Sequence, residues 1–371
     1  MTSKIKIDIP FFISVIILAL AGYLIFSSAS LGLLASSGSQ YSSVTLNQTI
    51  FGLLFGAIAC LVTSFIPYQF YKTHAFYIFL ASIIATLLVF APKIGFSHGG
   101  AARWVDIGPV SFEPSELLKI GYIIYISAWL TSVKDKVKTF KQGFLPFLIA
   151  TAVIALVLLK QPDTDTFLVT VFAGLGIFVI AGGRWRYLFA TAAIGIIGIA
   201  GLAYMRPYVM ARITTFMHPQ ADALGSGYQI QQSLIALGSG GLHGRGYGQS
   251  IQKFNFLPEP IGDSIFAVAG EEFGFIGTSL LILFFCFFAV RGLKIASQAK
   301  DSFGRLLASG IVILVIAQAF VNIGAMTNIL PLSGIPLPFV SHGGTSLLIT
   351  LAEIGIILNI SKTAKRKHES R

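Results

Sequence analysis

Ten long apolar runs, separated by short polar segments, constrain the fold of this chain more than any other feature. A helix of about 20 mostly apolar residues can cross the hydrocarbon core of a membrane. Only 11% of the residues are charged and 55% are apolar, whereas a soluble protein carries about 25% charged residues. The sequence therefore predicts an all-α integral membrane protein, a polytopic bundle of about ten transmembrane helices. The runs fall at about 11–34, 46–66, 74–91, 115–132, 144–159, 166–183, 187–205, 264–290, 304–326 and 344–361.

The runs and their connections leave no room for a separate soluble domain, so we expect a single transmembrane domain over residues 1–371. Lys4 and Lys6 precede the first run, as they would in a signal peptide. That run is nevertheless longer than the roughly 7–15 apolar residues of a signal peptide, and we expect an uncleaved first helix. Outer loops and a cytoplasmic tail are expected at about 91–114, 206–262, 327–343 and 362–371.

The large extracellular loop between helices 7 and 8, at 206–262, is rich in glycine and contains apolar stretches such as 230–237. A long loop without secondary structure is usually functional or disordered. The apolar stretches argue against a solvated linker and predict a segment that is partly re-entrant or lies on the membrane surface.

The lysines and arginines predict the orientation, because cytoplasmic loops carry an excess of them. With the N-terminus in the cytoplasm, 18 of the 26 fall in cytoplasmic segments, seven fall outside and Lys119 lies within a helix. This asymmetry predicts that both termini are cytoplasmic. It also explains most of the net charge of +11, so a nucleic-acid partner is not expected.

Several classes of chemistry find no support in the sequence. Cys60 and Cys286 each lie inside an apolar run and are expected to behave as small hydrophobic residues. The chain contains no Walker A sequence, zinc signature or dinucleotide fingerprint. ATP hydrolysis, hydride transfer and a cysteine metal site are therefore not expected, and no metal ligands are predicted.

The large outer loop contains side chains suited to a phosphorylated sugar. Gln229, Gln231 and Gln232 can form hydrogen bonds with sugar hydroxyls, and Arg245 and Lys253 can meet phosphate. These residues are candidates for binding the substrate and its pyrophosphate.

Asp263 lies where the large loop meets the eighth predicted helix. It can cap that helix as a hydrogen-bond acceptor, or face the mouth of a cavity as a base, and the two roles are compatible. Glu259 is a second carboxylate in the same loop. Two carboxylates near one site suit acid–base chemistry on a sugar.

Other charged residues border the remaining outer segments. Glu116 and Lys119 are three residues apart on one helix face, so they form either a structural ion pair or part of a polar site. Arg103 is an interfacial anchor or a phosphate ligand. Asp163 is expected to cap the sixth helix. His342 can titrate near neutral pH, although a loop histidine is more often only a hydrogen-bonding group.

At these residues the sequence resembles the SEDS family of proteins for shape, elongation, division and sporulation, the FtsW and RodA proteins. The resemblance covers nearly the whole chain, and its motifs occur in the expected order. The segments that carry it are 100–119, 161–163, 227–248, 257–274 and 334–344.

The resemblance implies ten transmembrane helices and peptidoglycan glycosyltransferase activity on lipid II, an undecaprenyl-pyrophosphate disaccharide-pentapeptide. Such proteins act in cell wall biogenesis at the outer face of the bacterial cytoplasmic membrane, with a class B penicillin-binding protein as the crosslinking partner and with other division or elongation membrane proteins. The essential carboxylate of the family falls on Asp263. Further structural or catalytic positions fall on Arg103, Glu116, Lys119 and Asp163.

The chain departs from the common family pattern at several positions near these motifs. Ile261 and Gly262 replace a usual His-Thr pair, and Asp165 replaces a usual glycine. His342 replaces a usual tyrosine and Asn328 a usual glycine. These differences concern the detail of the cavity and not the class of protein, and the division type (FtsW) is favoured over the elongation type (RodA).

We hypothesise that Asp263 is the general base of an inverting glycosyl transfer with undecaprenyl pyrophosphate as the leaving group. Arg103, Arg245 and Lys253 are the candidate cations for that group, and a divalent cation, Mg²⁺ or Mn²⁺, is the one cofactor left open. The alternatives are a lipid II flippase and a non-catalytic division scaffold. A flippase would place charged residues along a path near the membrane midplane.

Overall fold

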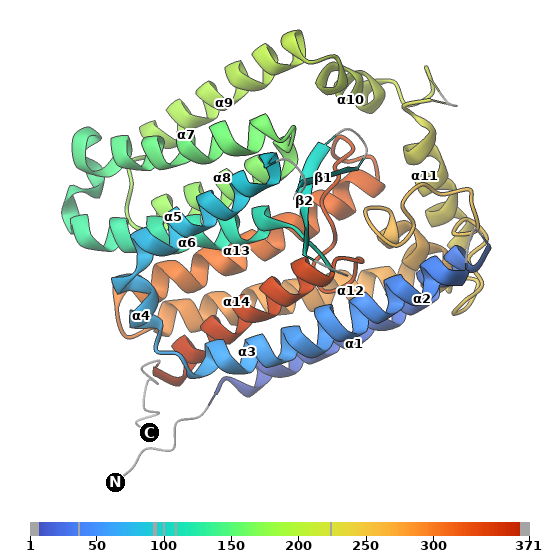
Figure 1. The fold of residues 1–371 in the computed structure, drawn as a ribbon, viewed down its shortest axis with the longest axis horizontal. Helices are drawn as coiled ribbons and strands as arrows, with labels where there is room; N and C mark the ends of the chain where they lie inside the picture. The colour runs from blue at the N-terminus through green and yellow to red at the C-terminus, as the bar shows by residue number, and fades with distance from the viewer. Residues whose placement is uncertain are drawn as a thin grey trace.

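The structure is a computed structural model that describes residues 7–35, 38–91, 95–98, 101–107, 110–222 and 225–363. Most of the chain is helical, and the long helices lie side by side along one direction (Figure 1). Almost all of the predicted tail at 362–371 lies outside the described residues, as do Lys4 and Lys6.

Eight helical segments of the described chain are long and apolar enough to cross a membrane. They are Ile9–Leu34, Gly38–Phe65, Pro114–Lys138, Phe140–Lys160, Trp185–Met205, Ile265–Gln298, Ser302–Met326 and Gly344–Thr363. Two shorter apolar helices, Ala75–Phe90 and Thr164–Ile180, take the places of the predicted third and sixth spans. The ten segments correspond one for one to the ten predicted runs, which confirms the prediction of about ten membrane helices.

Short 3-10 and π turns interrupt several of these spans, so that one span contains more than one helix. The first part of the chain contains α1 (Ile9–Ser30), η1 (Leu31–Ala35), α2 (Gly38–Asn47), η2 (Gln48–Leu54), α3 (Phe55–Phe65), α4 (Tyr68–Thr73), α5 (Ala75–Leu87), η3 (Leu88–Phe90), α6 (Pro114–Val133), η4 (Lys134–Lys138) and η5 (Phe140–Phe144). It continues with α7 (Leu145–Lys160), α8 (Thr164–Ile180), α9 (Trp185–Met205), α10 (Pro207–Met217), α11 (Tyr228–Gly240), α12 (Ile265–Gln298), α13 (Ser302–Met326) and α14 (Gly344–Thr363).

Helices α13 and α14 form the centre of the bundle, and most of their residues are buried. Helix α14 packs along α3, and α13 packs between α12 and α8. The α3–α14 contact is close enough for the Thr63 hydroxyl to donate to the backbone oxygen of Ala352 at 2.8 Å, as small polar residues do between membrane helices. Helix α9 buries only Tyr187, Thr191 and Ala203 and lies at the edge of the bundle (Figure 1).

The predicted outer loop at 91–114 is largely a small antiparallel sheet and not an irregular segment. Its strands are β1 (Gly95–His98), β2 (Ala101–Ile107) and β3 (Val110–Phe112), in the order β1-β2-β3. Trp104 pairs with Phe96, and Val105 pairs with Gly95 on one side and Phe112 on the other. Aromatic and β-branched residues favour this pairing. The all-α prediction is correct for the membrane bundle but missed this sheet, which carries Arg103.

The loop at 206–262 also contains regular structure that its glycine content did not predict. Pro207 occupies the first turn of α10, where the missing N–H is tolerated. Helix α11 buries one face, which includes Ile230, Ser233 and Ala236, and packs on α12. The remainder, 241–263, forms a series of turns beside the start of α12. The loop therefore forms an ordered cap at one end of the bundle (Figure 1).

Helix α12 is broken at Gly274, whose φ of 66° and ψ of −166° are not helical. The break frees two backbone carbonyls of α12, and the loop uses them. The N–H groups of Arg245 and Gly246 donate to the oxygens of Glu271 and Glu272, each at 3.0 Å. Only glycine adopts this backbone conformation without strain. A Cβ at position 274 would also collide with the backbone of Gly244.

The first and last described helices meet at one end of the bundle. The backbone N–H of Asp8, which caps α1, lies 3.4 Å from the hydroxyl of Ser361 in α14. The sheet and α11 lie at the opposite end (Figure 1). This arrangement requires an even number of crossings, as predicted, and separates the outer loops from the ends of the described chain.

Candidate active site

A cavity of about 370 Å³ opens at the end of the bundle that carries the sheet. Segments far apart in the sequence meet there: strand β2, the first turns of α6 and α8, helix α10, and the segments 259–263 and 334–346. The charged residues of its wall are Arg103, Glu113, Glu116, Lys119, Arg212, Glu259 and Asp263. Acids and bases therefore face one polar cavity beside the membrane bundle.

The backbone around Asp263 is held from three directions. The amide of Asn322 on α13 donates to the backbone oxygens of Asp263 and Ile335, each at 2.8 Å. The hydroxyl of Ser341 donates to the oxygen of Gly262 at 2.7 Å, and the N–H of His342 donates to the oxygen of Ile261, also at 2.7 Å. These bonds fix the main chain without using the Asp263 side chain.

The carboxylate of Asp263 faces the cavity and does not cap α12. Ser264 occupies the N-cap position, without a side-chain capping bond. In the part of the chain that the structure describes, no donor is bonded to the Asp263 carboxylate. The capping alternative is therefore not what the structure shows. Burial raises the pKa of Asp263 to about 7, with Glu259 and Asp165 adding to the rise and Arg103 and Arg212 opposing it.

Arg103 links the sheet to the α7–α8 hairpin. Its Nη2 donates to the oxygen of Pro162 at 3.1 Å and lies 3.5 Å from Oδ1 of Asp163. Asp163 caps α8 as predicted, since its Oδ1 accepts from the N–H of Thr166 at 3.4 Å. Burial raises the pKa of Asp163, and the charge of Arg103 opposes that rise. Arg103 is therefore held within the cavity wall.

Glu116 and Lys119 form the predicted ion pair, with Nζ 2.7 Å from Oε1. Both side chains are buried, yet both line the cavity. The pair is therefore both a structural ion pair and part of a polar site. Glu113 lies at the start of the same helix and was missed by the sequence interpretation. Burial raises its pKa to about 7, and Glu116 and Asp163 add to the rise. Glu113 is thus a second carboxyl group of the cavity wall whose pKa lies near neutral pH.

Arg212 and Asp165 were also missed as site residues. Nη1 of Arg212 on α10 lies 2.7 and 2.9 Å from the two carboxylate oxygens of Asp165. Asp165 Oδ2 also accepts the N–H of Gly334 at 3.0 Å. The two residues are 47 positions apart, and Gly334 belongs to a third segment. A contact between such distant segments produces no local pattern in the sequence. Asp165 itself had two signals, its place in the first turn of α8 and its replacement of a usual family glycine, but neither indicated Arg212 as its partner.

The remaining predicted binding residues divide between the cavity and its surroundings. Glu259 and His342 line the cavity. The ring of His342 stacks on Phe26, with 5.8 Å between ring centroids, and burial lowers its pKa to about 4, so it stays neutral. Gln229 instead donates to the hydroxyl of Ser264 at 3.0 Å. Gln229 and Gln232 lie on α11, outside the cavity wall.

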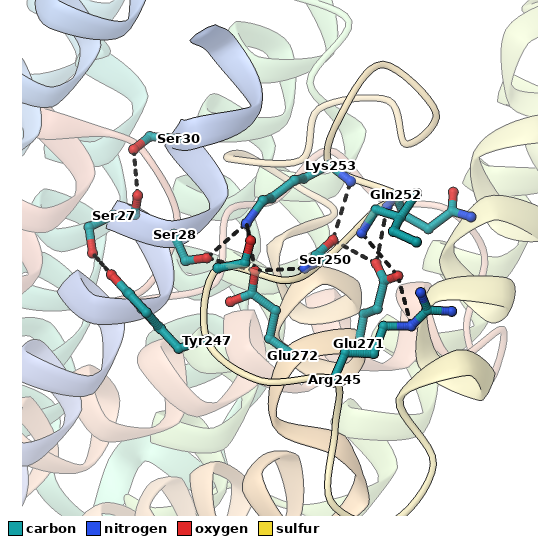
Figure 2. A network of polar contacts seen from close by, with 12 residues as sticks. Ser27, Ser28, Ser30, Arg245, Tyr247, Ser250, Gln252, Lys253, Glu271 and Glu272 are labelled. Atoms are coloured by element: carbon teal, nitrogen blue, oxygen red, sulfur yellow. Dashed lines mark hydrogen bonds and ion pairs between the residues drawn. The ribbon is translucent and has the colours of Figure 1, made fainter. Parts of the chain in front are cut away.

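Lys253 does not lie in the cavity, where the sequence interpretation put it as a phosphate ligand. Its Nζ lies 2.7 Å from Oε1 of Glu272, 3.0 Å from the Ser28 hydroxyl and 2.8 Å from the oxygen of Gly248 (Figure 2). The side chain is fully buried by these contacts. Lys253 therefore fixes the loop to α1 and α12, and three acceptors satisfy its ammonium group.

Arg245 also contacts a glutamate of α12 and not the cavity. Its Nε lies 3.4 Å from Oε1 of Glu271 (Figure 2). Glu271 also accepts from the Ser250 hydroxyl at 2.6 Å and from the N–H groups of Ile251 and Gln252 at 3.1 Å each. Arg245 is not part of the cavity wall. Of the three predicted pyrophosphate cations, only Arg103 reaches the cavity.

A metal ion has no ready ligand set in this site. Within the described residues, no three or more His, Cys, Asp or Glu side chains gather closely enough to hold one. The carboxylates of the cavity wall instead come from two segments, Glu113 and Glu116 from the start of α6 and Glu259 and Asp263 from the turns before α12.

Comparison with known proteins decides the family. The sequence profile of the cell cycle proteins FtsW, RodA and SpoVE matches residues 9–366. The chain belongs to this family. A probable peptidoglycan glycosyltransferase FtsW of Geobacter sp. (strain M18) is 40% identical over 314 residues, 85% of each chain. Stage V sporulation protein E of Bacillus subtilis (strain 168) is 38% identical over 316 residues, 84% of this chain and 86% of that protein.

Two solved structures share the fold of this chain. A chain from a study of structural coordination of polymerization and crosslinking by a peptidoglycan synthase complex matches with a TM-score of 0.74 at 24% identity, over 92% of this chain and 96% of that one. The rod shape determining protein RodA of Thermus thermophilus matches with a TM-score of 0.66 at 23% identity, over 94% and 97%. The fold of these two chains is therefore present here over nearly its full length.

Proposed function

We propose that this protein is a peptidoglycan glycosyltransferase that polymerises lipid II into β-1,4 glycan strands during cell division or elongation. Family membership and relatives named as probable peptidoglycan glycosyltransferases support the proposal. The observation that carries the mechanism is the Asp263 carboxylate, which faces a polar cavity with no bonded donor among the described residues. A base needs an accessible carboxylate with a pKa near the working pH.

Asp263 is the general base of this mechanism. It takes the proton from the 4-hydroxyl of the acceptor N-acetylglucosamine as that oxygen attacks the anomeric carbon of the donor N-acetylmuramic acid. The configuration inverts, and undecaprenyl pyrophosphate leaves. A general base typically accelerates such a step by about 10²- to 10⁴-fold. Arg103, which lines the same cavity, supplies positive charge for a substrate that carries a diphosphate.

The proposal also places the protein in its surroundings. The cavity would face the outer side of the bacterial cytoplasmic membrane, and both termini would lie in the cytoplasm, as the distribution of Lys and Arg indicates. The partner would be a class B penicillin-binding transpeptidase, together with other division or elongation membrane proteins. A structural relative from a complex that coordinates polymerization and crosslinking is consistent with such a partner.

The Asp263→Asn variant tests the mechanism. The amide has nearly the same shape but cannot accept a proton, so polymerisation of lipid II by purified protein with its transpeptidase should fall by about 10²-fold or more. The melting temperature in detergent should change little, because the side chain forms no bond with the described protein. Asp301→Asn is the control, because Asp301 caps α13 and lies outside the cavity wall. Polymerisation by this variant should stay close to that of wild type.

The same preparation distinguishes the alternatives. Polymer on a gel that disappears in Asp263→Asn supports an enzyme with Asp263 as base, whereas full activity of that variant contradicts the assignment. Transfer of lipid II across vesicles without polymer would indicate a flippase. Neither polymer nor transfer, with the division complex still assembled, would indicate a scaffold.

A further inference from the structure

The ion pair between Arg212 and Asp165 holds a guanidinium group in the cavity wall. Arg212 comes from α10 and Asp165 from the first turn of α8, and Nη1 lies 2.7 and 2.9 Å from the two carboxylate oxygens. Asp165 is itself fixed, because its Oδ2 accepts the N–H of Gly334 at 3.0 Å. The orientation of Arg212 is therefore set by a carboxylate that the backbone holds in place.

Most of the donors of Arg212 remain available. Its Nη1 alone meets Asp165, and among the described residues no protein acceptor is bonded to Nε or Nη2. The side chain is 32% exposed and lines the cavity. A guanidinium group carries five N–H donors in a planar fork, which suits two oxygens of a phosphate. Arg212 therefore presents unused donors to whatever occupies the cavity.

A second guanidinium group faces the same place. A Cβ atom at Gly334 would lie 3.8 Å from Nη1 of Arg103 and 4.0 Å from Oδ2 of Asp165, the partner of Arg212. The same position would lie 3.5 Å from Oδ2 of Asp263. Arg103, the Arg212–Asp165 pair and the proposed base therefore gather around a residue without a side chain. The missing side chain keeps this space open.

We propose that Arg212 and Arg103 together bind the diphosphate of the lipid-linked donor, and that Asp165 positions Arg212 for this contact. The assignment rests on the proposed function and adds to it the site of the leaving group. As the acceptor oxygen bonds to the anomeric carbon, its proton passes to Asp263. The bond from that carbon to the diphosphate oxygen breaks, and its electron pair stays on the diphosphate. Two guanidinium groups stabilise the charge that develops there.

The other cations predicted as candidates for binding the substrate or its pyrophosphate do not compete for the role. Lys253 and Arg245 lie outside the cavity wall and meet Glu272 and Glu271. Lys119 lines the cavity, but its ammonium group is buried against Glu116. Within the described wall, Arg103 and Arg212 are the arginines, and arginine matches the two-oxygen geometry of phosphate better than lysine does.

The chain offers a matched control for Arg212. At the opposite end of the bundle, Nη2 of Arg291 lies 2.7 and 2.9 Å from the two carboxylate oxygens of Asp8. The geometry equals that of the Arg212–Asp165 pair, and the Arg291 side chain is 21% exposed. This pair also links separate helices, but it lies far from the cavity. Arg291→Ala therefore reports what the loss of a helix-linking ion pair does by itself.

The test measures binding as well as turnover. Farnesyl diphosphate and farnesyl monophosphate are titrated into detergent-purified wild type, Arg212→Ala, Arg212→Lys, Asp165→Asn and Arg291→Ala. Wild type should prefer the diphosphate, and Arg212→Ala should bind it about 10- to 100-fold more weakly, as the loss of a charged hydrogen bond predicts. Arg212→Lys should restore part of the affinity. Asp165→Asn should raise KM for lipid II more than it lowers kcat, and Arg291→Ala should resemble wild type.

Failure of the diphosphate site and failure of the proposed function can be told apart. Unchanged diphosphate affinity in Arg212→Ala would overturn the inference, because Arg212 would then serve only to hold α10, even if polymerisation fell. Diphosphate binding that depends on Arg212, in a protein that makes no polymer from lipid II with its partner present, would contradict the proposed function. In that case the diphosphate site would still stand.

Discussion

The charge of a single carboxyl group controls the proposed reaction. Because burial, with Glu259 and Asp165 adding to it, raises the pKa of Asp263 to about 7, the group changes its protonation state near neutral pH. A general base must be deprotonated to act. The fraction of active enzyme therefore rises as the pH increases through this range, and protonation below it removes activity.

This predicts the pH dependence of kcat/KM for lipid II polymerisation. The rate should increase about tenfold for each pH unit well below the pKa of Asp263 and level off above about pH 8. Asp165→Asn should move the midpoint to lower pH, because it removes one of the charges that raises the pKa. A profile that is flat from about pH 5.5 to 8.5, or a midpoint unmoved in Asp165→Asn, would contradict this account.

The sequence predicted some residues of the site and could not predict others. Asp263, Arg103, Glu116 and Lys119 lie beside recognisable motifs, and the structure places all four in the cavity wall. Arg212 had no such signal, because its partner Asp165 lies 47 residues away and its orientation depends on the path of α10. Distant contacts also explain why the prediction of Lys253 as a phosphate ligand was not met. Its acceptors come from α1, α12 and its own loop.

At the scale of elements, hydrophobicity predicted the helices of the membrane bundle but not the structure of the outer segments. Long apolar runs give a strong signal because lipid requires every backbone group to be bonded within the span. Strands β1, β2 and β3 and helix α11 are short. Their stability comes from packing on the bundle, as α11 packs on α12, and that contact is not visible in local composition.

The break in α12 is the element on which the shape of the large loop depends. Gly274→Ala should displace the loop, because a Cβ there would meet the backbone of Gly244 and because alanine is strained at a φ of 66°. We expect a loss of about 1–3 kcal/mol in the free energy of unfolding, measured as a lower melting temperature in detergent, together with reduced polymerisation.

A glycine elsewhere provides the control for Gly274→Ala. Gly195 lies within helix α9, and nothing comes within 4 Å of a Cβ built there. Gly195→Ala should leave the stability unchanged or raise it by up to about 1 kcal/mol, as alanine does in a helix. Equal effects of the two substitutions would show that the break at Gly274 is not what holds the loop.

At the scale of the whole molecule, the bundle separates two polar ends. The start of α1 meets the end of α14 at one end, and the sheet lies at the other (Figure 1). The cavity borders this sheet. In the proposed orientation, exposed residues beside the cavity face the outside of the cell. Exposed residues of the α12–α13 connection, such as Lys300, face the cytoplasm.

Cysteine labelling tests this orientation. In a background with Cys60 and Cys286 replaced by serine, a membrane-impermeant thiol reagent should label Gln220→Cys in cells whose cytoplasmic membrane the reagent can reach from outside. Lys300→Cys should react only after the membrane is opened, since both positions are exposed and differ in side. Labelling of Lys300→Cys in intact cells would reverse the orientation and exclude the proposed site of polymerisation.

The buried contact between Lys253 and Glu272 gives the large loop an anchor that dissolved ions do not reach. Mobile ions screen exposed charges over a Debye length of about 8–10 Å in physiological salt, but they act far less on charges sealed inside protein. The Lys253 and Glu272 side chains are 0% and 1% exposed, whereas those of Arg212 and Asp165 are 32% and 12% exposed. In the proposed orientation, changes of ionic strength outside the cell therefore leave the Lys253–Glu272 contact almost unscreened, whereas the Arg212–Asp165 pair beside the cavity is exposed to the surrounding electrolyte.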